Sequence, residues 1–173
     1  MATGYYKEQD IKLKSIDVLN ETDQKFLYDV VLYRWRFHET VNITYKTPPT
    51  PPTYEQHIQY LKKNNYKEIY RICLGEFAVG TVYIDTNNVF SIFILPNLLK
   101  LALKEKKFIK NSNKRLATIV IHKLMKLNSN IKTFYVGINA KNTASLNTAI
   151  ELQCCYPIEY VLGCTNIFYE NGG

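Results

Sequence analysis

The chain has no long apolar run and no recognisable export signal, and both absences exclude whole classes of protein. No stretch of the sequence reaches the about 18 consecutive apolar residues that a membrane-spanning helix needs. The N-terminus also lacks the apolar core of a secretory signal peptide. We therefore expect a soluble, cytoplasmic protein without a membrane partner.

Cysteine is scarce, and its spacing excludes the common metal sites. The four cysteines, at positions 73, 154, 155 and 164, form no C-x-x-C pair and no Cys/His cluster with zinc spacing. The adjacent Cys154 and Cys155 are badly placed to bridge each other. We expect free, buried thiols in a reducing compartment and no bound metal.

Acidic residues are in short supply relative to basic ones. The chain has 15 Asp and Glu against 22 Lys and Arg, a formal net charge of +7. A basic balance favours anionic partners such as a phosphorylated cofactor, a nucleotide-linked substrate or nucleic acid. Nucleic acid has the least support, since no RNP-like or GXXG pattern is present. A Lys-rich surface in solvent accounts for much of the same excess.

The chain is long enough for one domain with one core, at 173 residues of which 46% are apolar. Hydrophobic periodicity and cap residues predict helices at 20–35, 53–64, 113–127 and 142–152, and strands at 11–16, 68–74, 77–85, 89–95, 134–138, 156–162 and 166–169. The three central strands are joined by tight turns, which predicts an antiparallel meander. Strands 89–95 and 134–138 flank a helix, which predicts a parallel pair with a right-handed crossover.

Two connections stand out in this pattern. Residues 46–53 contain four prolines, which predicts an extended loop. Thr53 and Gln56 then form a capping box that starts the next helix. The Lys/Leu-rich stretch 97–110 is about ten residues longer than an ordinary connection.

The order of elements resembles the GNAT N-acetyltransferase fold over nearly the whole chain. The segment Gly137–Ser145, with Asn142 followed by Ser145, is similar to the family's late strand and helix start. The resemblance implies a single α/β domain with a central, twisted mixed sheet flanked by helices, over residues 1–169. Residues 170–173 are expected to be a tail or the start of a linker in a longer protein.

The resemblance also implies acetyl-coenzyme A as co-substrate. In the family the strand that matches 89–95 pairs with the pantetheine arm, and the following helix start holds the pyrophosphate. The family's phosphate loop reads Arg/Gln-x-x-Gly-x-Gly/Ala, and Ala117 fits its last position while Arg115 stands where the first glycine belongs. The implied cofactor-binding residues are Phe93, Ile94, Leu95, Asn113, Lys114, Arg115, Leu116, Ala117, Asn142 and Ser145.

The front of the chain is similar to the GNAT branch that acetylates nucleotide-linked sugars or ribosomal protein N-termini. The shared pattern is a Trp-Arg helix end followed by a Glu-x-His helix, here at Trp35-Arg36 and Glu55–His57. The implied substrate-binding residues are Arg34, Trp35, Arg36 and Tyr83. For the two arginines, binding of an acceptor diphosphate or carboxylate and ordinary surface ion pairing are equally compatible with the sequence.

Acetyl transfer to an amine needs a group that takes the amine proton and one that protonates the departing thiolate. The family's usual catalytic tyrosine aligns with Ala149, so the proton donor lies elsewhere. The predicted catalytic residues are His38, Asp85 and Tyr156, with Glu76, His57 and Tyr83 as further candidates. A turn-forming role for Asp85 and a structural role for His57 remain the competing interpretations.

The sequence thus predicts an N-acetyltransferase that transfers acetyl from acetyl-coenzyme A in a ternary complex. The first acceptor we expect is a nucleotide-linked amino sugar, such as a UDP- or dTDP-4-amino-4,6-dideoxyhexose. A protein or peptide amine, and a non-catalytic GNAT-like binding domain, are the alternatives. The assembly stays open, a homodimer included.

Overall fold

The computed structural model describes residues 8–36, 50–63, 65–106, 116–139, 143, 147–148, 158–161 and 164–170. The elements in chain order are a short 3-10 helix (Glu8–Asp10), β1 (Ile11–Ser15), α1 (Glu21–Trp35), α3 (Tyr54–Lys62), β2 (Tyr66–Leu74), β3 (Phe77–Asp85), β4 (Phe90–Ile94), α4 (Pro96–Lys106), α5 (Leu116–Leu127), β5 (Thr133–Asn139), β6 (Ile158–Val161) and β7 (Cys164–Glu170).

The predicted antiparallel meander is confirmed. Strands β1, β2, β3 and β4 form one sheet in that order, and each pair is antiparallel. The β2–β3 turn contains Gly75 at φ 61° and the β3–β4 turn contains Asn88 at φ 62°. Glycine and asparagine are the residues that tolerate this left-handed conformation best, which explains why the chain reverses at these positions.

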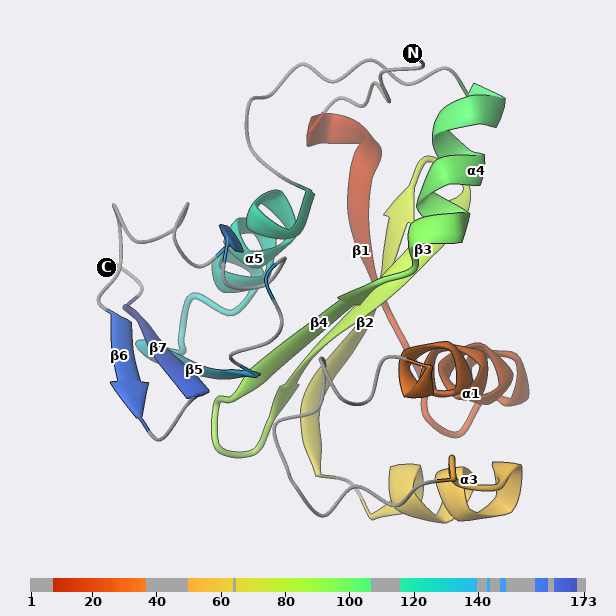
Figure 1. The fold of residues 1–173 in the computed structure, drawn as a ribbon, viewed down its shortest axis with the longest axis horizontal. Helices are drawn as coiled ribbons and strands as arrows, with labels where there is room; N and C mark the ends of the chain where they lie inside the picture. Colours follow the sequence, from red (N-terminus) through yellow and green to blue (C-terminus); the bar gives the residue numbers. More distant parts are fainter. Residues whose placement is uncertain are drawn as a thin grey trace.

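A second sheet holds the C-terminal strands in the order β5-β7-β6, again antiparallel. The two sheets meet at a parallel bridge between Val89 and Tyr135, where the Tyr135 N–H donates to the Asn88 carbonyl at 2.9 Å. The predicted parallel relation of these strands is therefore confirmed at one end only. Beyond the bridge β4 and β5 separate (Figure 1), and no other described strand pairs with the outer edge of β4.

Alternation along the strands gives the first sheet two buried faces. One face carries Ile72, Val82 and Ile84 into the main core, which α5 covers with Ile119 and Val120. The opposite face packs a smaller cluster that α1 and α3 cover. That cluster consists of Leu27, Leu61 and Ile69, with Ile16, Val18, Ile58, Tyr66 and Tyr83 packed against it. Helices therefore flank this sheet on both faces, as predicted.

The helix α4 lies in the Lys/Leu-rich stretch to which the sequence assigned no structure. Ala102 is fully buried and Leu99 packs against the main core, while Leu98 and Leu101 are 38% and 45% exposed. The apolar residues of α4 therefore divide between core and solvent. None of the described helices is long and apolar enough to cross a membrane.

Most of the predicted helix 142–152 lies outside the described residues. Thr143, Asn147 and Thr148 within it are helical. The predicted starts of the two front helices are confirmed. Asn20 caps α1, and Thr53 with Gln56 forms the capping box of α3 at 2.9 and 3.2 Å.

Candidate functional site

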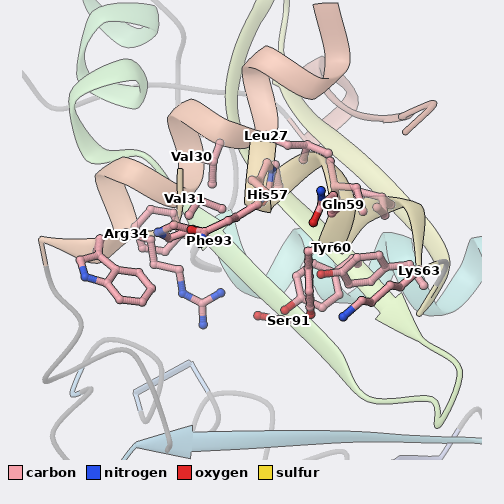
Figure 2. Close-up of a pocket in the computed structure, with 18 residues that line it drawn as sticks. Leu27, Val30, Val31, Arg34, His57, Gln59, Tyr60, Lys63, Ser91 and Phe93 are labelled. Carbon is pink, nitrogen blue, oxygen red and sulfur yellow. The ribbon is translucent and has the colours of Figure 1, made fainter. Parts of the chain in front are cut away.

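A pocket of about 610 Å³ opens between α1, α3 and the sheet face that these helices cover (Figure 2). Its volume is within the range of small-molecule sites, about 300–1,000 Å³. The residues that line it are Leu27, Val30, Val31, Arg34, Trp35, Pro52, Gln56, His57, Gln59, Tyr60, Leu61, Lys63, Tyr66, Ile69, Thr81, Tyr83, Ser91 and Phe93.

Strand register places the floor of the pocket. Tyr83 pairs with both Ile69 and Ser91, and Thr81 pairs with Phe93, so these side chains share one face of the sheet. The inner strand β3 and the edge strand β4 thus contribute to the same surface. The pocket therefore reaches β4, whose outer edge pairs with no described strand beyond the Val89–Tyr135 bridge.

Helical spacing places the walls. Leu27, Val30, Val31 and Arg34 recur three to four residues apart and form one face of α1. The same spacing recurs in α3 and its C-cap, which contribute Gln56, His57, Tyr60 and Lys63. The apolar members lie toward the cluster at the base of the pocket, and the polar members follow at the ends of the helices.

An aromatic group occupies one side. Tyr66 packs edge-on against Tyr83 with ring centroids 4.7 Å apart and against Tyr60 at 6.0 Å. Burial, and then the neighbouring Tyr83, raise the pKa of Tyr66 well above the usual range for a phenol. Tyr66 therefore stays protonated at physiological pH and can donate a hydrogen bond.

The formally charged lining residues are all cationic. Arg34 and Lys63 line the pocket, and no Asp or Glu belongs to the described lining. Within the described ranges, neither of these two residues has a carboxylate within ion-pair distance. Figure 2 shows the charged ends of both side chains on the side of the pocket where Ser91 lies. The pocket therefore presents a positive potential to an incoming ligand.

His57 is a buried polar residue in the wall of the pocket. It is 5% exposed, and its Nε2 has no hydrogen-bond partner among the described residues. Its ring lies 5.7 Å from that of Tyr28. Burial lowers the pKa of His57 below its usual value, so the imidazole is neutral at physiological pH.

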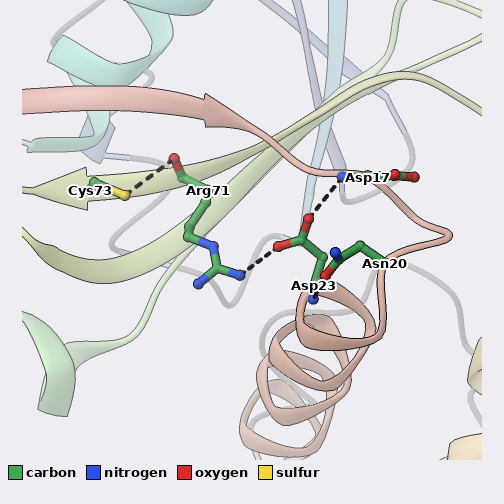
Figure 3. A network of polar contacts seen from close by, with 5 residues as sticks. All are labelled: Asp17, Asn20, Asp23, Arg71 and Cys73. Carbon is green, nitrogen blue, oxygen red and sulfur yellow. Dashed lines mark hydrogen bonds and ion pairs between the residues drawn. The ribbon is translucent and has the colours of Figure 1, made fainter.

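The helix α1 is anchored at its first turn, away from the pocket (Figure 3). The Asp23 carboxylate accepts from the Arg71 guanidinium at 2.7 Å and from the Asp17 N–H at 3.0 Å. Asn20 Oδ1 accepts from the Asp23 N–H at 3.1 Å, and the Arg71 guanidinium lies 4.0 Å from the centre of the Phe26 ring. These contacts tie α1 to β2 and so set the position of the pocket wall.

The structure brings several predicted site residues together. Arg34, Trp35 and Tyr83, predicted to bind substrate, line the same pocket as Phe93, predicted to bind the cofactor. Arg36 does not line it. Its side chain is exposed, with the guanidinium 5.4 Å from the centre of the Tyr33 ring.

Asp85 also lies outside the pocket lining. Its Oδ1 accepts from the Asn87 N–H at 2.8 Å and from the Val89 N–H at 3.0 Å. The carboxylate therefore holds the turn between β3 and β4, the competing interpretation of the sequence.

The remaining cofactor residues fall in β4 and α5. Ile94 pairs with Gly80, where an added Cβ would lie only 2.2 Å from the Phe93 carbonyl oxygen, so glycine permits this close approach. The Leu95 N–H donates to the Val79 carbonyl at 2.7 Å and is not free for a thioester oxygen. Leu116 and Ala117 form the first turn of α5, and the Leu116 side chain is in the main core.

Seven predicted site residues lie outside the described residues: His38, Asn113, Lys114, Arg115, Asn142, Ser145 and Tyr156. Their roles stay predictions. Among the lining residues that the sequence did not assign to a site are Tyr60, Lys63, Tyr66 and Ser91. The spacing of His57, Tyr60 and Lys63 on one helix face was the available signal. Within the described chain, no group of His, Cys, Asp or Glu side chains could hold a metal ion.

The arrangement of helices around an antiparallel meander, joined to a second sheet by one parallel contact, is a mixed α/β fold. Comparison with known proteins defines it further. No protein-family model matches the chain, and no match is found among the curated proteins. Solved structures do match, over nearly the full length of the chain.

The spermidine N-acetyltransferase of Vibrio cholerae, in complex with CoA and spermine, matches with a TM-score of 0.64 and 12% identity, over 94% of this chain and 96% of that one. A domain from Methanocaldococcus jannaschii matches with a TM-score of 0.65 and 16% identity, over 92% and 97%. An acetyl transfer enzyme of Salmonella typhimurium, which modifies the N-terminal serine of a 50S ribosomal subunit protein, matches with a TM-score of 0.59 and 14% identity, over 91% and 92%. The chain therefore has the GNAT fold, as predicted from the order of its elements.

Proposed function

We propose that the protein is an acetyl-coenzyme A-dependent N-acetyltransferase whose acceptor is the amine of a nucleotide-linked amino sugar. The observation that carries the proposal is the position of the pocket. Ser91 and Phe93 of β4 line it, and no described strand pairs with the outer edge of β4 beyond the Val89–Tyr135 bridge. An acceptor in the pocket and a cofactor along β4 would therefore meet at one strand.

The chain offers a fitting place for the pantetheine arm. The edge of β4 that faces away from β3 presents backbone groups over Ser91–Ile94 without a described partner strand. An amide-containing chain can pair with such an edge as an added strand would. When bound, acetyl-coenzyme A supplies the acetyl thioester. The residues at 113–117 remain our proposal for the pyrophosphate, at the start of α5.

The pocket also fits the requirement that the attacking amine be neutral. A cationic ammonium group is disfavoured by burial against the apolar floor and by the nearby Arg34 and Lys63. Both effects lower the pKa of a bound amine. His38 and Tyr156 remain the proposed proton acceptor and donor. Asp85 also remains a candidate, although its Oδ1 holds the turn between β3 and β4.

The proposed acceptor matches the lining in size and chemistry. The pocket volume of about 610 Å³ exceeds what a simple amine would need. The rings of Tyr60 and Tyr66 offer faces on which a sugar or base can pack, and Arg34 can bind a diphosphate. The similarity to an enzyme that modifies a protein N-terminus makes a peptide amine the second candidate.

A thiol-release assay with acetyl-coenzyme A tests the proposal. We expect turnover with UDP- or dTDP-linked 4-amino-4,6-dideoxyhexoses and little with peptides that carry a free N-terminus. Turnover with peptides alone would reject the sugar acceptor. Thermal unfolding with and without acetyl-coenzyme A is the companion measurement, since a bound ligand raises the melting temperature. No shift at millimolar ligand together with no thiol release would leave a non-catalytic domain.

A further inference from the structure

We infer that Arg34 and Lys63 form an anion-binding subsite, so that the pocket takes acceptors bearing a phosphoryl group and excludes polyamines. The inference rests on the proposed function in one respect, namely that the acceptor enters this pocket. It adds that the substrate must be anionic, and that Arg34 and Lys63 select for this negative charge.

The first argument is that no carboxylate of the described residues neutralises the positive charge of the pocket. Neither Arg34 nor Lys63 has a carboxylate partner within the described ranges. The contrast is Arg71, whose guanidinium binds the Asp23 carboxylate at 2.7 Å. Two cations facing one cavity repel each other, and an anion in that cavity removes the repulsion. The pocket therefore favours a ligand that brings negative charge.

The second argument comes from the other titratable groups that face the pocket. His57 from α3 is neutral, because burial lowers its pKa. Tyr66 from β2 keeps its proton, because burial raises its pKa. The remaining titratable members are Tyr60 on α3 and Tyr83 on β3. No described lining residue thus supplies the negative charge that the several ammonium groups of a polyamine require.

The third argument is the position of neutral donors beside the cations. Tyr66 and Ser91 line the pocket together with Arg34 and Lys63. The charged ends of Arg34 and Lys63 lie on the Ser91 side of the pocket (Figure 2). A guanidinium, an ammonium and hydroxyl donors are the groups that bind phosphoryl oxygens in proteins. The subsite therefore fits a nucleoside diphosphate.

The test is direct binding, with UDP, dTDP and inorganic pyrophosphate as probes in isothermal titration calorimetry. We expect Arg34→Gln and Lys63→Gln each to weaken the binding of the nucleotides at least tenfold, and added salt to weaken wild-type binding. Lys62→Gln is the matched control, since Lys62 is exposed on the same helix and does not line the pocket. Its affinity should stay within twofold of wild type. Pyrophosphate binding without nucleotide selectivity would show that the subsite reads the phosphoryl groups alone.

Three results would overturn the inference: no nucleotide or pyrophosphate binding at millimolar concentration, equal losses in Lys62→Gln and Lys63→Gln, or acetylation of spermidine as efficient as that of an anionic amine. Melting temperatures of the variants show whether a loss of affinity reflects unfolding. Lys63 is exposed at the C-cap of α3, so Lys63→Gln is the variant less able to disturb the fold. The binding arm needs no turnover. Anion binding without acetyl transfer would reject the proposed function and keep the subsite. Efficient transfer to spermidine would reject both the subsite and the nucleotide-sugar acceptor, and would leave only the acetyltransferase activity.

Discussion

An arginine guanidinium lies near each end of helix α1, and only one of the two has a carboxylate partner among the described residues. At the first turn Asp23 binds Arg71 of β2, with both side chains about four-fifths buried, at 20% and 23% exposed. At the last turn Arg34 faces the pocket with no carboxylate partner in the described chain. One helix thus joins a neutralised, structural end to an end whose charge is left for something else.

The difference shows that the charged pair at the first turn stabilises the fold, whereas the charge of Arg34 at the last turn does not. A partly buried charge without a partner costs free energy, and a folded protein keeps such a group where binding or catalysis requires it. His57 of α3, whose Nε2 has no hydrogen-bond partner among the described residues, lines the same pocket as Arg34. Two unsatisfied groups in one pocket point to a ligand, and the satisfied network at the other end holds the helix in place for it.

The largest expected effect comes from breaking the structural end. Asp23→Ala leaves the Arg71 guanidinium without its carboxylate and the Asp17 N–H without its acceptor. We expect the free energy of unfolding to fall by about 2 kcal/mol, because charged hydrogen bonds in a partly buried site are lost. Urea unfolding followed by circular dichroism measures this loss.

The matched control for Asp23→Ala is Lys25→Ala on the same helix. Lys25 pairs with Glu21 at 3.0 Å, but the side chains are 64% and 77% exposed, so solvent screens the pair. We expect a much smaller change in stability. Equal losses for the two variants would mean that the Asp23–Arg71 pair does not anchor α1, and the comparison between the two ends would fail.

A smaller effect is expected from pH at the pocket end. The pKa of His57 is lowered by burial from an ordinary value of 6.5, so the unfolded chain binds a proton there more readily than the folded one. Stability should therefore decrease as pH falls below about 6.5 and level off once the folded form is also protonated. This pH dependence distinguishes the pocket from the first turn of α1, because the described contacts of Asp23 include no histidine.

The measurement is the melting temperature of wild type and His57→Gln between pH 8 and pH 5. We expect the wild type to lose more stability on acidification, so that the two curves converge toward low pH. Parallel curves over this range would show that His57 is not held neutral in the folded protein. The variant also reports on the pocket, since glutamine keeps a polar group near the position of the imidazole.

Local signals predicted most of the elements that build the site. Asn20 and Thr53 marked the starts of α1 and α3 because a cap residue acts through backbone groups only two or three residues away. The turns at Gly75 and Asn88 marked the meander for the same reason. The helix α4 was missed, although Leu98, Leu101 and Ala102 recur at helical spacing in the stretch that follows Pro96.

The site was predictable only in part. The family resemblance pointed to Arg34, Tyr83 and Phe93, and the structure places all three in one pocket. Lys63 and Ser91 were missed because they share a pocket only where α3 packs over the sheet face to which β4 contributes, and this packing is a tertiary contact. Asp85 carried a carboxylate that the sequence could assign to catalysis or to a turn, and only the hydrogen bonds to Asn87 and Val89 distinguish the two.

The smallest expected effect is on stability at the pocket end, and it tests the comparison most directly. Arg34→Met and Arg71→Met remove the same charge from the two ends and keep an apolar stem of similar length. Arg71→Met should cost about 2 kcal/mol, because it leaves Asp23 partly buried without its partner. Arg34→Met should change the free energy of unfolding by less than about 0.5 kcal/mol, because no carboxylate depends on it. Urea unfolding of both variants beside nucleotide titration separates the roles: stability lost at Arg71 and affinity lost at Arg34. If the two variants are destabilised alike, Arg34 has a structural partner and the pocket end of α1 is not reserved for an anionic ligand.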